Sequence, residues 1–283
     1  MSIFASAVTC VWGVGAPVAR RGLAGHDSSR VNTVFAALLG FGAALGIAGC
    51  GSTEEGPAPS LETRFPADAS EDLALSFDGE NDYATMGLGG FPLATAAQTI
   101  TARVKPTSTG GTQALLVLRL DFEHGIALGF RDDLPTAWRV WGGNIFAQGP
   151  ALNDGEWHHV AYVSTGGDSA THILYIDGSE VDRDTVEPSN RTPTSAWLGS
   201  VDGKGQFYRG ALDDVCVWEG ARSPEDIAAE ANDGPSQAPQ LLGYWSFDES
   251  SGELARDRSG NGNHAVLGDG IADFIPARVA TVP

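Results

Sequence analysis

Acidic and amide side chains gather at two places where an extended run meets a turn. Asp78, Asn81 and Asp82 follow one such run, and Asp213 and Asp214 enter a later one. Calcium takes six to eight oxygen ligands, which carboxylates and amides in turns supply. Asp78, Asp213 and Asp214 are therefore candidate ligands of Ca²⁺. The alternative is that Asp78 belongs to an ordinary turn and that Asp213 caps or pairs locally.

A further oxygen-rich segment runs from Asp257 to Asn263. It has oxygen-bearing residues at alternate positions and a glycine at the sixth, as in an EF-hand loop. The twelfth position is Gly268 rather than glutamate, and no helical pattern flanks the segment, which excludes an EF-hand. The pattern favours a turn rich in glycine and asparagine, with a minor calcium loop as the alternative.

Two adjacent histidines, His158 and His159, lie in one extended run. Neighbouring residues of a strand point to opposite faces, so the two rings do not simply ligate one metal ion. We expect one histidine to lie in the core or in a cross-strand pair and the other to be exposed.

Tryptophans offer flat surfaces on which a sugar ring can stack. Trp138 and Trp141 lie beside the loop 142–144, so we assign them as candidate ligand-binding residues. Cys216 lies in an apolar run, where a free thiol behaves as a small hydrophobe. The three cysteines of the chain are too few to indicate a disulfide framework.

The stretch 156–184 is the part of the chain around which the other strands are expected to be arranged. Large residues crowd two short runs, 157–163 and 171–176, as in buried strands. Asp177-Gly178 follows, and an Asp-Gly pair between two extended runs predicts a tight hairpin, because its turn needs positive φ at both residues. A glycine-rich cluster between the first two runs predicts another turn. The stretch is expected to be a three-stranded antiparallel meander.

Further extended runs and one helix surround this meander. The runs are 73–77, 83–88, 97–104, 113–120, 125–130, 137–141, 196–199, 207–218 and 241–247. Together they indicate about twelve to fourteen strands. The helix is expected to begin after Ser223, a natural N-cap, with Pro224 in its first position and Asp226 three residues after the cap. We expect it to pack on a sheet edge.

Four segments in this order resemble the laminin-G-like domains of the concanavalin-A-like jelly-roll fold. They are 75–83 (LSFDGENDY), 154–181 (DGEWHHVAYV…LYIDGSEV), 210–227 (GALDDVCVWEGARSPEDI) and 243–264 (GYWSFDESSGELARDRSGNGNH). The resemblance implies an all-β domain at residues 73–283, a two-sheet antiparallel jelly-roll sandwich with one short helix. It also implies that Asp78 and Asp213 or Asp214 approach each other.

The same resemblance places Trp157, Trp218 and Trp245 in the core. In many relatives, segments like 243–264 precede the Phe-Asp-Gly strand, whereas here they follow it. The chain ends of a two-sheet sandwich lie close together, so either order builds the same neighbours. We therefore expect the strand at 241–247 to pair next to the strand at 73–77.

The fold hosts lectins, adhesion modules, enzymes and structural domains, so function has to be argued from residues. The β-glucanases of this fold carry the pattern Glu-x-Asp-x-x-Glu, which supplies acid and nucleophile from one strand. The nearest match is 180–185 (EVDRDT), which ends in threonine. We predict a non-catalytic binding module for glycan or protein ligands. The alternatives are a structural or adhesion domain and, less favoured, a glycoside-active enzyme.

An export signal is indicated before the domain. Residues 31–49 carry no charge, follow Arg30 and end in small residues, as in a secretory signal. The ending Ile47-Ala48-Gly49-Cys50 resembles the bacterial lipobox, which implies that Cys50 is lipidated through its thiol and becomes the N-terminus. The alternative is an uncleaved membrane helix. Residues 1–49 are assigned as the signal, and we interpret 1–30 as an over-long gene start.

Residues 50–72 hold the lipidated cysteine and a tether rich in Gly, Pro, Ser, Thr and acid. The chain carries a net charge of −19, which repels nucleic acid and anionic membrane, so we expect no nucleic-acid partner and membrane contact only through the lipid anchor. Gly51 stands where an aspartate often retains lipoproteins at the inner membrane. We therefore expect a bacterial cell-envelope protein at the outer membrane or cell surface.

Overall fold

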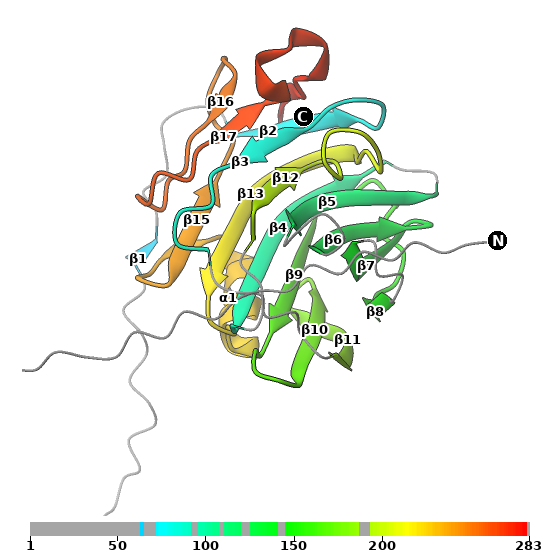
Figure 1. The fold of residues 1–283 in the computed structure, drawn as a ribbon, viewed down its shortest axis with the longest axis vertical. Helices are drawn as coiled ribbons and strands as arrows, with labels where there is room; N and C mark the ends of the chain where they lie inside the picture. The colour runs from blue at the N-terminus through cyan, green and yellow to red at the C-terminus, as the bar shows by residue number, and fades with distance from the viewer. Residues whose placement is uncertain are drawn as a thin grey trace, which may run out of the picture. The chain divides into compact units, whose positions relative to one another are not determined.

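The computed structural model describes residues 63–64, 72–91, 96–107, 110–119, 125–140, 145–186 and 193–281 of the chain. The chain divides into two units, Met1–Pro57 and Ala58–Pro283, and every described residue belongs to the second. In this unit two eight-stranded sheets pack face to face (Figure 1). The predicted all-β sandwich with one short helix is confirmed. Among the described residues, no helix is long and apolar enough to cross a membrane.

The first sheet contains β13, the longest strand of the described fold. Its strands lie in the order β11 (Ser179–Val186), β10 (Ala170–Ile176), β9 (His158–Ser164), β4 (Gln98–Pro106), β13 (Arg209–Glu219), β2 (Leu73–Asp78) and β18 (Ala277–Ala280). An eighth strand, β15 (Leu241–Trp245), also pairs with β13. Because β2 pairs with the first half of β13 and β15 with the second half, both lie along the same edge of it.

The second sheet covers the other side of the core. Its order is β16 (Leu254–Ala255), β17 (Ala265–Leu267), β3 (Ala84–Met86), β12 (Ser195–Leu198), β5 (Thr112–Arg119), β6 (Gly125–Arg131), β7 (Leu134–Val140) and β8 (Ile145–Gln148). A separate two-residue ladder joins β1 (Thr63–Arg64) to β14 (Ser236–Gln237). Two 3₁₀ turns, η1 (Gly268–Gly270) and η2 (Ala272–Phe274), precede β18.

Two expectations about the strands need correction. The described residues form eighteen strands rather than about twelve to fourteen, because the sequence pattern misses short ones such as β16 and β18. The strand expected at 241–247 does not pair with β2. Besides β13, the partner of β2 is β18, with Val279 opposite Ala74. Pairing of the two ends of the domain is observed, but through a later segment than predicted.

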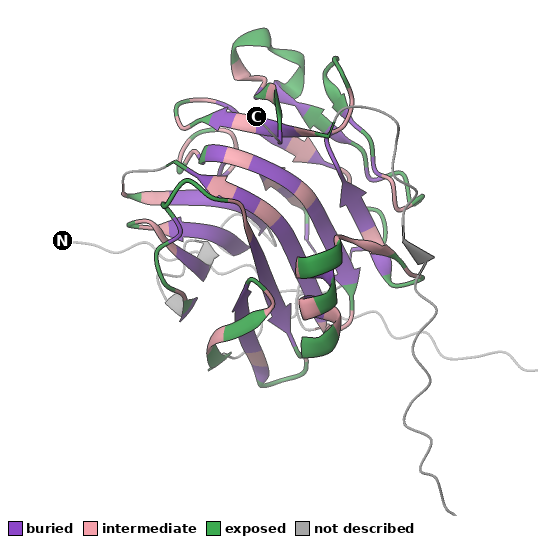
Figure 2. Ribbon diagram, turned by 180° about the vertical axis from the view of Figure 1, so that it is seen from behind, coloured by how far each residue is buried: buried purple, intermediate pink, exposed green. Residues whose placement is uncertain are grey.

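Alternate residues of the strands fill the space between the sheets. On β4, Ile100, Ala102 and Val104 are fully buried in the main core cluster. The outward residues of β4 are Thr99, Thr101, Arg103 and Lys105. Figure 2 shows that most strand residues are buried. Some of that burial lies on the outer face, because further elements cover part of it.

The helix α1 (Pro224–Asp233) covers part of the outer face of the first sheet. Ser223 accepts a hydrogen bond from the backbone N–H of Asp226 and donates its own N–H to that carboxylate, so the predicted cap is confirmed. Ile227 packs against outward residues of β9 and β10, which are Ala161, Val163, Ile173 and Tyr175. Glu230 is buried and accepts a hydrogen bond from Thr101 of β4. The helix therefore lies across the face of the sheet, rather than only at its edge.

The segment from Asp257 to Asn263 forms a hydrogen-bonded turn. Both carboxylate oxygens of Asp257 accept backbone N–H groups, from Tyr244 at 3.1 Å and from Asn263 at 2.8 Å. The side chain of Asn263 is buried and bonds both the N–H and the carbonyl of Gly89, at 2.6 and 2.8 Å. These oxygens already have partners, so the turn interpretation fits this segment better than a calcium loop.

The predicted hairpin at Asp177 and Gly178 is confirmed, with φ of 49° and 76°. Asp177 lies 2.9 Å from Nδ1 of His158, and Asp154 lies 3.1 Å from Nε2 of the same ring. Burial lowers the pKa of His158, but its hydrogen bonds to Asp177 and Asp154 and their charges outweigh burial, so the pKa lies above its ordinary value. Through these two contacts His158 joins the turn before β9 to the β10–β11 hairpin. His159, by contrast, is buried beneath α1, 3.7 Å from Glu230.

We predict that His158→Gln destabilises the fold most at acid pH. The folded-state pKa of His158 is raised, so its contribution is fully present below the unfolded value, about 6.5, and is lost as the pH rises through the folded value. The difference in melting temperature between wild type and variant should be largest below about pH 6.5 and should shrink as the pH rises through the folded-state value. A difference that grows with pH would contradict the assignment.

Candidate functional site on the outer face of the first sheet

A bulge in β13 sets which residues face outwards. Asp213 pairs with Arg103 and Cys216 pairs with Thr101, so two residues of β13 oppose one residue of β4. Asp214 is the extra residue and has a φ of 45°. Before the bulge, the odd-numbered residues of β13 therefore point outwards. After the bulge, the even-numbered residues do. Asp213 faces outwards before the bulge, and Cys216 after it. Burial raises the pKa of the Cys216 thiol, as expected for a small buried hydrophobe.

Before the bulge, small residues form a trough across the sheet. Ala211 of β13 lies between Lys105 of β4 and Ser76 of β2 in the strand register. At Gly210, whose φ is 146°, a Cβ would lie 2.5 Å from the carbonyl oxygen of Lys105. Only glycine allows β13 to approach β4 so closely there. Continuing the β4–β9 register by one residue places Trp157 beside Lys105, at one side of the trough.

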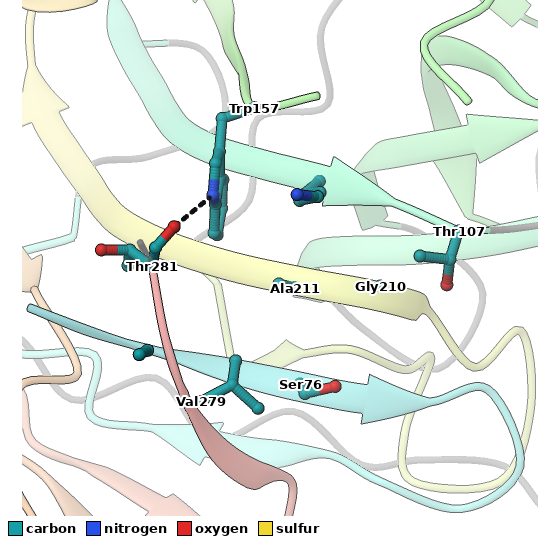
Figure 3. Close-up of a pocket in the computed structure, with 9 residues that line it drawn as sticks. Ser76, Thr107, Trp157, Gly210, Ala211, Val279 and Thr281 are labelled. Atoms are coloured by element: carbon teal, nitrogen blue, oxygen red, sulfur yellow. Dashed lines mark hydrogen bonds between the residues drawn. The ribbon is translucent and has the colours of Figure 1, made fainter. Parts of the chain in front are cut away.

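The trough is the floor of an open pocket of about 310 Å³. Its lining residues are Ser76, Lys105, Thr107, Trp157, Gly210, Ala211, Val279, Ala280 and Thr281. In Figure 3 the indole ring of Trp157 stands edge-on at one end of the floor, with Thr107 at the other end and Val279 and Ser76 along the side. The volume lies at the lower end of the usual range for small-ligand sites, about 300–1,000 Å³.

Two contacts fix the indole ring of Trp157. Its Nε1–H donates to the carbonyl oxygen of Thr281 at 3.2 Å (Figure 3). The guanidinium carbon of Arg103 lies 5.1 Å from the ring centroid, a cation–π contact. Thr281 is held in turn by Asp72, because its N–H donates to the Asp72 carbonyl oxygen at 3.1 Å. The pocket wall is therefore built before a ligand arrives.

A buried acidic pair lies behind this wall. Arg103 donates to Asp213 at 3.1 Å and lies 3.7 Å from Asp214, which also accepts a hydrogen bond from the Tyr244 hydroxyl at 2.8 Å. Burial raises the pKa of both carboxyls, the charge of Asp214 raises that of Asp213 further, and Arg103 opposes these effects. The pKa of Asp213 reaches about 9.

The structure does not bring Asp78 to Asp213 and Asp214. Asp78 pairs with Arg209, and Asp213 lies four residues further along β13, about 13 Å at the usual rise of a strand. A cation beside Asp213 would also meet Arg103. At the turn itself, Oδ1 of Asp78 accepts the N–H groups of Glu80 and Asn81, at 2.7 and 3.3 Å. The implied approach of these aspartates is therefore wrong.

The Asp78 turn still offers some oxygen atoms to a cation. Oδ1 of Asn81 is buried and has no hydrogen-bond partner among the described residues. Burial raises the pKa of the neighbouring Asp82, and the charge of Asp78 adds to this effect. No cluster of three or more His, Cys, Asp or Glu side chains placed to hold a metal occurs in the described part of the chain. Calcium binding stays a prediction. Of the two separate places, the Asp78 turn is a better candidate than the pair Asp213 and Asp214.

The tryptophan assignments from sequence are only partly tested. Trp245 is buried in the core, and Trp218 is buried on the outer face, beneath the guanidinium of Arg222. Trp157, assigned to the core by resemblance, instead lines the pocket and is half-buried. Trp141 and Cys50 lie outside the described residues, and of Trp138 only the backbone, in β7, is described. The ligand-binding assignment of Trp138 and Trp141 stays a prediction.

The sequence comparison identifies the family of this sandwich. Residues 78–228, just over half of the chain, match the family model described as the concanavalin A-like lectin/glucanases superfamily. The chain belongs to this superfamily. No curated protein matches the chain. Membership agrees with the sandwich and with the resemblance of the four sequence segments, and it leaves the ligand open.

A search of solved structures found several that are similar to this chain. A Bacteroides ovatus protein proposed to bind carbohydrate has a TM-score of 0.57 and 14% identity, over 76% of this chain and 61% of that protein. A heptameric pentraxin from Limulus polyphemus has a TM-score of 0.49 and 19% identity, over 71% and 97% of the two chains. Domains LG4-5 of the mouse laminin α1 chain have a TM-score of 0.43 and 19% identity, over 54% of this chain and 43% of that chain. At 14% identity, the similarity to the Bacteroides ovatus protein concerns the fold alone.

We predict that calcium raises the melting temperature through the Asp78 turn. Binding to the folded state alone, at a hundredfold excess over Kd, stabilises by about 2.7 kcal/mol, or roughly 5–10 °C for a domain of this size. Asp78→Ala should lose this gain, Asp214→Ala should keep it, and magnesium should give less because it prefers tight octahedral geometry. Identical melting temperatures of the wild type in chelator and in millimolar calcium would contradict the predicted calcium site.

Proposed function

We propose that this chain is a non-catalytic glycan-binding module of the bacterial cell envelope, which holds a sugar ring in the pocket beside Trp157. The observation that carries the proposal is the pocket itself. It is lined by Trp157, Ser76, Thr107 and Lys105, over a floor of small residues.

The chemistry of this lining suits a sugar. One face of a pyranose ring carries mainly C–H groups and packs well on an aromatic surface, while the hydroxyls at its edge need hydrogen-bond partners. Trp157 supplies the surface, and its contacts with Thr281 and Arg103 hold it in place. A preformed site loses little entropy on binding. The name of the Bacteroides ovatus protein adds support for a carbohydrate ligand.

The arrangement of carboxylates supports a role without catalysis. Glycoside hydrolysis usually needs two carboxyl groups on either side of the scissile bond, about 5–10 Å apart. None of the nine residues that line the pocket is acidic. Asp213 and Asp214 lie next to Arg103, away from the lining, and Glu180 on the edge strand β11 is paired with Arg183.

The proposed location follows from the predicted lipid anchor. A lipidated Cys50 and the tether 50–72 would hold the domain near the membrane without burying it. A strongly acidic domain would stay clear of the anionic bilayer surface. The pocket would then be free to bind glycans outside the cell, at the outer membrane or cell surface.

We predict that Trp157→Ala weakens glycan binding about thirtyfold, the effect of losing an aromatic anchor worth about 2 kcal/mol. A glycan array, with and without calcium, would identify the bound glycans, and calorimetry would measure their affinities. Trp157→Phe should retain most of the affinity because it keeps an aromatic face. Trp197→Ala, on the second sheet, is the matched control and should bind as the wild type does.

Three results would contradict this account in different ways. Wild-type affinity in Trp157→Ala would move the site elsewhere, with Trp138 and Trp141 as the next candidates. Binding of no glycan on the array would favour a structural or adhesion role. Turnover of a polysaccharide in an activity screen would reject the non-catalytic assignment.

We predict that protein extracted from membranes begins at Cys50 and carries two or three acyl chains. The expectation follows from the lipobox-like segment Ile47-Ala48-Gly49-Cys50. Intact mass spectrometry measures it, and a Cys50→Ala variant should gain no acyl mass. Finding residues 31–49 still attached to the wild type would refute the anchor.

A further inference from the structure

Lys105 introduces a positive charge into the pocket of an acidic protein. The chain contains two lysines, Lys105 and Lys204, and has a net charge of −19. Lys105 is half-buried on the outward side of β4 and lines the pocket, whereas Lys204 is exposed in a turn. The strand register places Lys105 directly opposite Ala211, beside Trp157.

Lys105 differs from the arginines of the same sheet face in its pairing. Nη1 of Arg103 lies 3.1 Å from Oδ2 of Asp213, and Nε of Arg222 lies 3.8 Å from Oε2 of Glu230. The side chain of Lys105 forms no hydrogen bond or ion pair with any residue that the structure describes. Its charge is therefore not neutralised locally, and no acidic residue lines the pocket beside it.

An unpaired ammonium in a small pocket favours an anionic ligand group. The pocket walls keep some water away, so a charge pair there is screened less than one on the open surface. Elsewhere the acidic surface repels anions, so an acidic glycan would be attracted mainly where a cation stands alone. A neutral sugar would gain much less from Lys105.

We propose that the pocket binds an acidic sugar, one that carries a carboxylate or a sulfate. The anionic group pairs with the ammonium of Lys105, the ring packs on Trp157, and Ser76 and Thr107 lie within the lining to receive the ring hydroxyls. This inference rests on the proposed function, because it names the class of glycan for the same pocket.

The experiment compares glycans that differ only in charge. Calorimetry would use oligogalacturonate against its methyl ester, and a sulfated galacto-oligosaccharide against its desulfated form. The wild type should bind the charged member of at least one pair about tenfold more tightly, and the pair that responds identifies the anion. The preference should shrink in high salt.

Variants of the two lysines test the residue. Lys105→Met should lose the preference and bind the charged and neutral members equally, while Lys105→Arg should keep much of it because the charge stays. Lys204→Met is the matched control and should behave as the wild type does. Melting curves of each variant check that the fold is unchanged.

The outcomes separate the inference from the proposed function. Equal binding of charged and neutral members by the wild type, or an array on which only neutral glycans bind, overturns the acidic-sugar inference and leaves glycan binding intact. An unchanged preference in Lys105→Met overturns the role of Lys105. Binding of no glycan at all overturns both, as does tighter binding of polyglutamate than of any glycan.

Discussion

The cross-strand contact between Arg103 and Asp213, next to the bulge at Asp214, is the constraint on which the outer face depends. Because of the bulge, the carboxyl of Asp213 faces outwards before it and the buried thiol of Cys216 faces outwards after it. Burying Asp213 is unfavourable unless it is hydrogen-bonded, and Arg103 and the N–H of Asp214 meet that need. Arg103 then supports Trp157 from behind.

The two faces of the first sheet pack against different elements. Its inner face packs against the second sheet with apolar residues such as Ile100, Val104 and Leu212. Its outer face is covered by α1 over β9 and β10, and at the other end Trp157 and residues of the edge strand β18 line the pocket. Between these covers the outward residues Ala211 and Ser76 are small, so the surface is hollow there. The pocket is thus a consequence of residue size along one row of the sheet.

Local features could be predicted from the sequence, and distant pairings could not. The Asp177-Gly178 hairpin and the Ser223 cap depend on a few adjacent residues, and both were predicted correctly. The pairing of β18 with β2 was missed because Ala277–Ala280 has little apolar alternation of its own. The expected approach of Asp78 to Asp213 failed because it depends on strand register, which local pattern does not fix.

Part of the pocket lining could be predicted from the sequence. The alternation of Thr101, Arg103 and Lys105 with Ala102 and Val104 marks Lys105 as outward-facing. Trp157 was wrongly assigned to the core because the family resemblance places it there. Its position is decided by long-range contacts, with Arg103 on β4 and with Thr281 near the end of the domain. Contacts between such distant residues leave no local signal.

The most direct test of the central claim is an NMR titration of ¹⁵N-labelled protein with a glycan that the array identifies. The account predicts that the indole N–H signal of Trp157 shifts, together with the amide signals of Thr107, Gly210, Ala211 and Thr281. Shifts confined to other tryptophans, with these signals unchanged, would contradict it and place the binding site elsewhere on the sandwich.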